Sequence, residues 1–275
     1  MKRREFLKTS VAASAISGLS LAGFKAAAQP KAGGNPEFYE LRAYHTKPGP
    51  GREMVEEYLA KALIPTLNRL GSKPVGVFAQ QERPGNPDRE EVREPDVIFA
   101  LIPYQSLDAF GATTLQIASD EEHHKLAGHY WRTPKSAPAF DRIMNSLMRA
   151  FTGMPHVELA SYSKEKRPRM FEIRYYQSHN EEKALKKIQM FNSGEIEVMR
   201  EVGLAPVFYG QVLVGREMPH LTYMLSAESV EAHKKHWEAF GKHPVWNKIK
   251  NDPEYADTVS NISKRFLVPT PYSQI

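Results

Sequence analysis

The densest group of chemically capable side chains lies near the C-terminal end of the chain. His233 and His236 are three residues apart and Trp237 follows directly, so a helix would place both imidazoles on one face. Such a pair could bind a divalent metal, supply one axial ligand to haem iron, or transfer protons as catalytic residues. Because no acidic residue follows at a recognised metal-ligand spacing, we predict no cofactor and keep metal or haem as the alternative. The other interpretation makes Trp237 a core contact and the histidines a solvated flank.

Glu195 is a further catalytic candidate because it lies within an apolar stripe. It follows Phe191 by four residues and Ile188 by seven, which is the spacing of one helix face. A carboxylate that faces an apolar wall has a raised pKa and could act as a general base. Alternatively, Glu195 stands at the edge of the stripe and its carboxylate reaches solvent.

Two strand-like segments carry the pattern Glu-x-Arg-x-Tyr, a candidate ligand-binding set. Its residues are Glu40, Arg42, Tyr44, Glu172, Arg174 and Tyr176. Because alternate residues of a strand share a face, we expect these side chains to point into the space between two sheets. The intervening Tyr39, Leu41 and Ala43 would then pack under helices. A guanidinium fixed beside a tyrosine hydroxyl could orient a carboxylate or an enolate, unless each arginine serves only to pair with its glutamate.

These two segments belong to an internal repeat. The matched pairs are Glu40 with Glu172, Gly71 with Gly203, and Ser106 with Ser229. The first two pairs are 132 positions apart and the last pair is 123 apart, so the first unit carries nine extra residues. We place them in the charged, proline-rich stretch 82–95. Two copies of one unit therefore organise the chain.

Each unit reads as strand, helix, strand, strand, helix, strand. In the first unit we expect strands at 37–45, 75–78, 97–102 and near Val157, with a first helix kinked at Pro65. In the second unit the same order falls at 171–176, 180–202, 207–214, 221–225, 229–240 and 259–268. This is the split β-α-β plan of the ferredoxin-like α+β unit, and a tandem copy would cover the free sheet face.

The motif Tyr-Glu-Leu-Arg-x-Tyr at 39–44 and the late Trp-x-x-Phe and His-Pro-x-Trp at 237–246 resemble the NIPSNAP family. Gly71, near the end of the first helix, adds to this resemblance, which covers nearly all of 38–268 as two NIPSNAP-like units. It implies an α+β fold of two tandem ferredoxin-like units that form an intrachain dimeric α/β barrel. The first unit departs from the family pattern because no Trp-x-x-Phe follows Ser106. The family has no assigned reaction, so the resemblance implies a fold and leaves the function open.

The first 28 residues read as a signal peptide. Lys2, Arg3 and Arg4 precede a weakly apolar run, and alanines at 26–28 offer a cleavage site. The order Arg-Arg-Glu-Phe-Leu-Lys resembles a twin-arginine signal, and an ordinary secretory signal is the alternative. We expect a periplasmic or extracellular protein with no stable membrane span. The predicted divisions are 1–28 signal, 29–36 linker, 37–163 first unit and 164–275 second unit.

Composition removes several function classes. The formal charge is +5, but cleavage after Ala28 leaves 32 basic against 31 acidic residues, so we expect no nucleic-acid partner. The absence of cysteine excludes thiolate catalysis and cysteine-ligated metals. The chain also has no G-x-G-x-x-G, P-loop or G-x-S-x-G motif.

The leading functional hypothesis is an exported NIPSNAP-like protein that binds a small apolar or aromatic molecule between its two sheets. Arg42, Arg174, Tyr44 and Tyr176 would orient the polar end of that molecule. One alternative is a cofactor-independent oxygenase or isomerase with Glu195 or a histidine as base. Another is a non-catalytic protein-interaction module. The sequence leaves the oligomeric state open.

Overall fold

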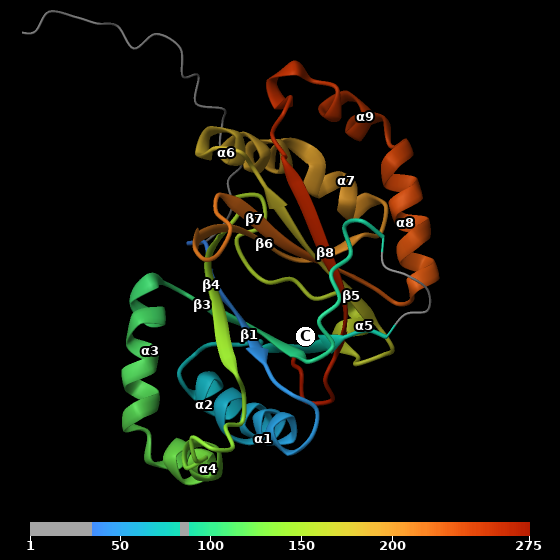
Figure 1. Ribbon diagram of the computed structural model, residues 1–275. Coiled ribbons are helices and arrows are strands. Elements are labelled where there is room, and N and C mark those ends of the chain that lie inside the picture. The colour runs from blue at the N-terminus through green and yellow to red at the C-terminus, as the bar shows by residue number, and fades with distance from the viewer. Residues whose placement is uncertain (1–34, 83–87) are drawn as a thin grey trace, which may run out of the picture.

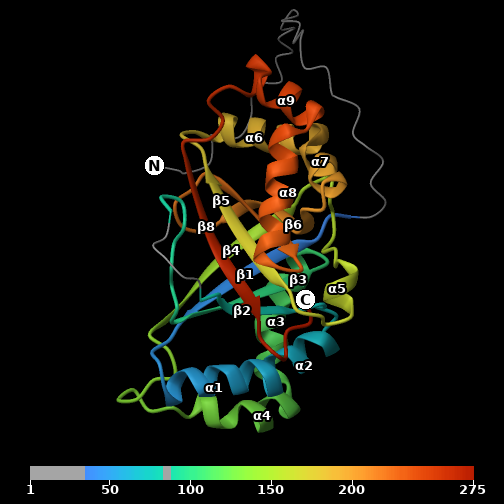
Figure 2. The ribbon, with the colours of Figure 1, turned by 90° about the vertical axis from the view of Figure 1, so that its right-hand side faces the viewer.

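The computed structural model describes residues 35–82 and 88–275, and its strands close into one barrel (Figures 1 and 2). The predicted signal segment lies outside the described residues. The strand order around the barrel is β1-β3-β2-β8-β5-β7-β6-β4. The strands are β1 (Phe38–His45), β2 (Gly76–Gln80), β3 (Val97–Tyr104), β4 (Arg142–Ala150), β5 (Met170–Gln177), β6 (Ala205–Val214), β7 (His220–Ala227) and β8 (Asn261–Pro269).

The barrel consists of two sheets with the same internal order. Strands β4-β1-β3-β2 form the first and β8-β5-β7-β6 form the second, and every pairing is antiparallel. The sheets meet at two seams, where β2 pairs with β8 and β4 pairs with β6. This arrangement confirms the predicted α+β fold of two ferredoxin-like units in one barrel.

Helices cover the outer face of each sheet. The first unit has α1 (Pro50–Tyr58), α2 (Ile64–Arg69), α3 (Leu107–Ser119) and α4 (Glu121–Trp131). The second unit has α6 (Glu181–Met190), α7 (Ile196–Glu201), α8 (Val230–Lys242) and α9 (Pro244–Lys250), and the short α5 (Ser161–Lys164) lies between the units in sequence. Ser106 and Ser229 cap α3 and α8 in the same way, each accepting a backbone N–H three residues on. Within the described residues, no helix has the length and apolar character needed to span a membrane.

A π-helical turn interrupts the first helix of each unit at the same repeat position. It covers Leu59–Leu63 in the first unit and Phe191–Glu195 in the second, 132 positions later. Pro65 stands just after the first of these turns, within the opening turn of α2, where a missing N–H costs little. The second unit has Glu197 at that position and still forms the turn. The interruption that we expected from Pro65 therefore belongs to the repeat and does not depend on the proline.

The strand predicted near Val157 is wrong. The strand that completes the first sheet is β4, Arg142–Ala150, which pairs with β1 along its whole length. Its two ends carry the exposed Arg142 and Arg149, and its middle carries the polar Asn145 and Ser146, so the segment lacks the apolar alternation that marks a strand. Val157 lies beyond β4, where its backbone N–H donates to Glu37 Oε2 at 2.9 Å.

Three large apolar clusters fill the described part of the molecule, one inside the barrel and one under each set of helices, and a small fourth cluster contains Met170, Ala227 and Phe266. The barrel interior contains Tyr39 and Leu41 from β1 with Phe171 and Ile173 from β5. Tyr44 belongs to the cluster under the first unit's helices. Tyr176 belongs to the equivalent cluster in the second unit.

Candidate functional site

The structure reverses the predicted strand faces. Glu40, Arg42 and Tyr44 lie on the helix side of the first sheet, and Glu172, Arg174 and Tyr176 lie on the helix side of the second. The expectation that these six residues point between the two sheets is therefore wrong. The physical reason is that charges inside an enclosed apolar barrel lack partners, whereas neighbouring strands and packed helices supply hydrogen-bond donors on the outer face.

In the first unit, Glu40 is the centre of a satisfied hydrogen-bond network. Arg42 donates to both of its carboxylate oxygens, with Nε at 2.7 Å and Nη2 at 2.9 Å. Tyr104 Oη donates at 2.9 Å and Asn145 Nδ2 at 2.7 Å. Four donors satisfy the buried carboxylate of Glu40, which indicates a structural role. This agrees with the alternative interpretation that each arginine serves only to pair with its glutamate.

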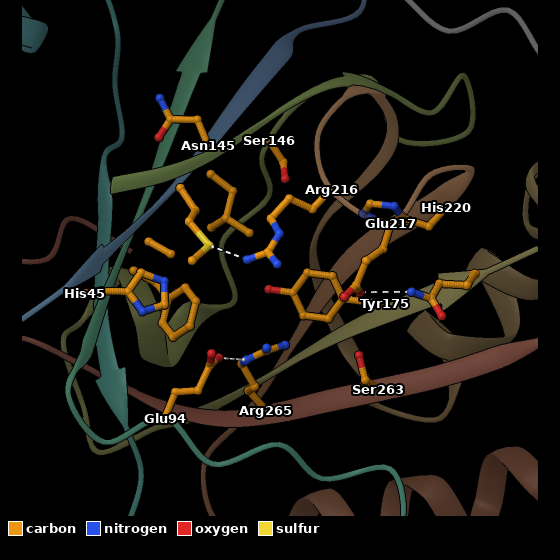
Figure 3. Close-up of a pocket in the computed structure, with 15 residues that line it drawn as sticks. His45, Glu94, Asn145, Ser146, Tyr175, Arg216, Glu217, His220, Ser263 and Arg265 are labelled. Carbon is orange, nitrogen blue, oxygen red and sulfur yellow. Dashed lines mark hydrogen bonds and ion pairs between the residues drawn. The ribbon is translucent and has the colours of Figure 1, made fainter. Parts of the chain in front are cut away.

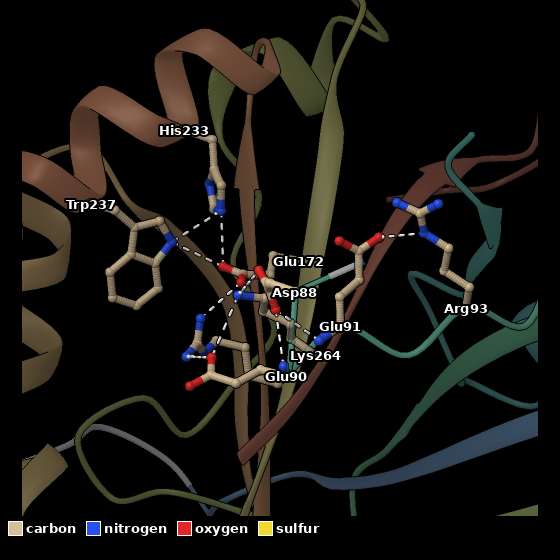
Figure 4. A network of polar contacts seen from close by, with 9 residues as sticks. Asp88, Glu90, Glu91, Arg93, Glu172, His233, Trp237 and Lys264 are labelled. Atoms are coloured by element: carbon tan, nitrogen blue, oxygen red, sulfur yellow. Dashed lines mark hydrogen bonds and ion pairs between the residues drawn. The ribbon is translucent and has the colours of Figure 1, made fainter. Parts of the chain in front are cut away.

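In the second unit, two of the three residues that contact the equivalent Glu172 come from helix α8 (Figure 4). Arg174 Nη1 lies 2.8 Å from one carboxylate oxygen. His233 Nε2 at 2.8 Å and Trp237 Nε1 at 2.9 Å both contact the other oxygen. Arg174 also stacks on the Trp237 ring, 4.9 Å from its centroid. The structure thus brings together four of the predicted site residues, from β5 and α8.

This environment keeps Glu172 ionised. Burial would raise its pKa, but Arg174, His233 and Trp237 together lower it to about 2. An ionised carboxylate only accepts hydrogen bonds, so the His233 Nε2–H donates a hydrogen bond to Glu172. His233 Nδ1 is buried and has no hydrogen-bond partner among the described residues.

The insertion of the first unit reaches this network from outside. Glu90 Oε2 lies 3.3 Å from Arg174 Nη2 and 3.4 Å from Lys264 Nζ on β8, and Asp88 Oδ2 lies 2.8 Å from the same lysine (Figure 4). Backbone hydrogen bonds between Glu90, Val92 and Lys264 hold the segment along β8. Residues 88–92 of the predicted insertion therefore connect the first unit to the sheet of the second.

Glu195 is buried, and its partner is Lys187, a residue that the sequence analysis missed. Lys187 Nζ lies 2.8 Å from Glu195 Oε2, and the side chains are 5% and 2% exposed. The Lys187 ammonium also lies 4.6 Å from the centroid of Phe191. Burial raises the pKa of Glu195, and Lys187 acts in the opposite direction. The repeat could have identified Lys187, because the equivalent position in the first unit is the apolar Val55 and a lysine at a core position needs a buried partner.

His233 and His236 contact different partners. His233 faces Glu172, whereas the His236 ring lies within about 3.0 Å of the position that a Cβ on Gly203 would occupy. Burial lowers the pKa of His236. Among the described residues, no group of three or more His, Cys, Asp or Glu side chains is arranged to hold a metal ion.

A cavity of about 220 Å³ lies at one mouth of the barrel, between the two sheets (Figure 3). It is formed where β1 and β5 end and where β4, β7 and β8 begin. Its lining residues are Leu41, Ala43, His45, Glu94, Phe99, Met144, Asn145, Ser146, Tyr175, Gln177, Arg216, Glu217, His220, Ser263 and Arg265. None of the ten predicted site residues is among them. The inward faces of β1, β5 and β8 become polar towards this mouth, and this trend would have located the cavity had the faces been assigned correctly.

The polar groups of the cavity are partly paired with one another. Arg265 forms an ion pair with Glu94 and lies over the Tyr175 ring, 4.8 Å from its centroid. Burial raises the pKa of Tyr175 and Arg265 lowers it. Burial also lowers the pKa of His220, whose Nδ1 has no hydrogen-bond partner in the part of the chain that the structure describes.

Comparison with protein families gives one match, to NIPSNAP, over residues 171–274. This range coincides with the second unit and supports the resemblance there. No curated protein has a significantly similar sequence.

Two solved structures share the complete barrel. One is a protein from Lactobacillus acidophilus described as a candidate monooxygenase, with 8% identity, a TM-score of 0.53, and coverage of 86% of this chain and 94% of that chain. The other, from Fusobacterium nucleatum and described in the same way, has 7% identity, a TM-score of 0.50, and coverage of 86% and 93%. Because each match spans nearly the whole of both chains, the two-unit barrel is a fold that solved proteins share.

Proposed function

We propose that the chain binds a small, largely aromatic molecule in the cavity at the barrel mouth. The observation that carries the proposal is the cavity of about 220 Å³ between the sheets, since the interior beyond it is filled by the apolar cluster. Its volume is below the roughly 300–1,000 Å³ of pockets for drug-sized ligands, which favours a single substituted ring. Phe99 and Tyr175 offer aromatic walls, and Leu41 and Met144 add apolar surface.

The position of Ala43 allows a direct test of this proposal. It lies on β1 at the cavity wall, and Ala43→Phe would fill the cavity with a ring. Aromatic probes such as benzoate, benzamide and benzyl alcohol should bind the wild-type protein in calorimetric or NMR titrations and should not bind Ala43→Phe. Ala118→Phe, at an exposed position on α3, is the matched control and should bind like wild type. Binding of these probes that survives in a folded Ala43→Phe variant would remove the proposal.

A cofactor-independent oxygenase or isomerase is the second candidate. One observation favours it: His220 lies at the cavity with its Nδ1 unpaired among the described residues, and burial lowers its pKa. A neutral imidazole beside a bound substrate can accept a proton. Oxygen uptake with catechol as the probe should then depend on His220 and be lost in His220→Gln. If the activity instead follows Glu195→Gln or His233→Ala, the base lies under the helices of the second unit.

We further propose that the chain is exported through its twin-arginine-type signal. Replacing Arg3 and Arg4 together by lysine should retain the precursor in the cytoplasm, whereas the wild-type protein should be recovered outside it with a new N-terminus near Gln29. Recovery of full-length wild-type protein in the cytoplasm alone would contradict this proposal.

A further inference from the structure

We propose that the cavity at the barrel mouth takes a small aromatic carboxylate and that Arg216 binds its negative group. This inference rests on the proposed ligand-binding function and adds the ligand class. Arg216 follows the end of β6 in the loop to β7, and its guanidinium points into the cavity (Figure 3). The Tyr175 hydroxyl points towards the same space, and His45 lies across from them (Figure 3).

Arg216 differs from the other arginine of the cavity in its partner. Arg265 is neutralised by Glu94. Arg216 Nη1 donates instead to Met144 Sδ at 2.9 Å, and no carboxylate of the described residues lies within ion-pair distance of it. A thioether is a weak acceptor, and a guanidinium has five N–H donors. The remaining donors of Arg216 are therefore available to an oxygen acceptor.

The planar fork of a guanidinium matches the two oxygens of a carboxylate. Phe99 and Tyr175 can contact the ring of such a ligand, and the Tyr175 hydroxyl can supply another hydrogen bond. Glu217 is the acid of the cavity that opposes a bound anion. Its Oε2 accepts from Gln177 Nε2 at 3.0 Å, so it is held at the end of β5 and is not paired with Arg216. Removing the charge of Glu217 should therefore strengthen anion binding.

The test compares benzoate with benzamide, its neutral isostere, in calorimetric titrations of the full chain at low salt. Wild type should bind benzoate about tenfold more tightly than benzamide, since pairing with an exposed guanidinium contributes that order of selectivity at low salt. Arg216→Gln should bind benzoate and benzamide equally, while Glu217→Gln should bind benzoate more tightly. Arg132→Gln removes an exposed positive charge on the first unit and should behave like wild type.

The two proposals fail in different ways. Equal affinity of wild type for benzoate and benzamide, or an unchanged benzoate preference in Arg216→Gln, would overturn the anion assignment and leave the ligand-binding function intact. Absence of binding by every aromatic probe, or binding that persists in Ala43→Phe, would overturn both. A preference lost in Arg216→Gln but also lost in Arg132→Gln would indicate general charge attraction and would also overturn the role of Arg216.

Discussion

Lys187 Nζ lies 2.8 Å from Glu195 Oε2 in the second unit, at positions where the first unit has Val55 and Leu63. The two apolar residues are completely buried, at 0% and 1% exposure. Both units close the same space between helix and sheet, one with an apolar pair and the other with an ion pair. The repeat thus contains its own comparison between two ways of filling one site.

This comparison predicts the cost of breaking the pair. Lys187→Met leaves Glu195 buried without its cation, and Glu195→Leu leaves the lysine without its anion, so each single change should lower the free energy of unfolding by about 3–5 kcal/mol. The double variant removes both charges and should be close to wild type or more stable. Urea unfolding at neutral pH measures all three variants. A double variant as unstable as the sum of the singles would contradict the prediction.

The fold could be predicted because the same pattern of strands and helices occurs twice in the sequence, so each unit supports the assignment of the other. Glu40 and Glu172, or Gly71 and Gly203, stand at equivalent places, and both glycines end their helices with positive φ, at 90° and 85°. A single unit would have left the order of strands ambiguous. The strand Arg142–Ala150 escaped prediction because the first unit diverges there and polar residues interrupt the apolar pattern on both faces of the strand.

The site was harder to predict because alternation identifies two faces without saying which one is inside. Arg42 and Arg174 looked like interior ligands, yet both lie on the outer face, where α8 supplies His233 and Trp237 as further partners of Glu172. No spacing within β5 reveals these two partners. Arg216 lies in a loop, and its approach to Tyr175 depends on how the barrel closes. Contacts between distant segments of this kind arise only in the assembled barrel.

Glu172 should make the protein sensitive to acid. Its folded pKa of about 2 is below its ordinary value of 4.5, so the stabilisation that it contributes is complete above 4.5 and is lost as the pH falls towards 2. The shift corresponds to about 3 kcal/mol. Urea unfolding of wild type and Glu172→Gln should therefore converge as the pH is lowered from about 5 to 2. A constant difference across this range would show that the carboxylate charge is not what stabilises the network.

Trp237→Phe tests the indole donor in the same network. The ring remains, but Glu172 loses the N–H that lies 2.9 Å away. Losing a hydrogen bond to a buried charge should cost about 1.5–3 kcal/mol and raise the pH at which acid unfolding begins. Trp246→Phe, where the ring packs on Phe240 at 4.6 Å between centroids, is the matched control and should leave the acid midpoint unchanged. Equal acid midpoints for both variants would count against the role of the indole.

A comparison of the two glycines that end the first helices distinguishes the cost of backbone strain from the cost of steric contact. Gly71 and Gly203 have nearly the same positive φ, but a Cβ on Gly71 meets no atom within 4 Å, whereas one on Gly203 meets His236 Nε2 at 3.0 Å. Gly71→Ala should therefore cost only the backbone penalty of about 1–2 kcal/mol. Gly203→Ala should cost more, because the half-buried imidazole of His236 must also shift. Adding His236→Ala to Gly203→Ala should then cost less than His236→Ala costs alone, since the small side chain relieves the contact. Equal losses for the two alanine variants, with no such coupling, would mean that His236 moves freely against the end of α7.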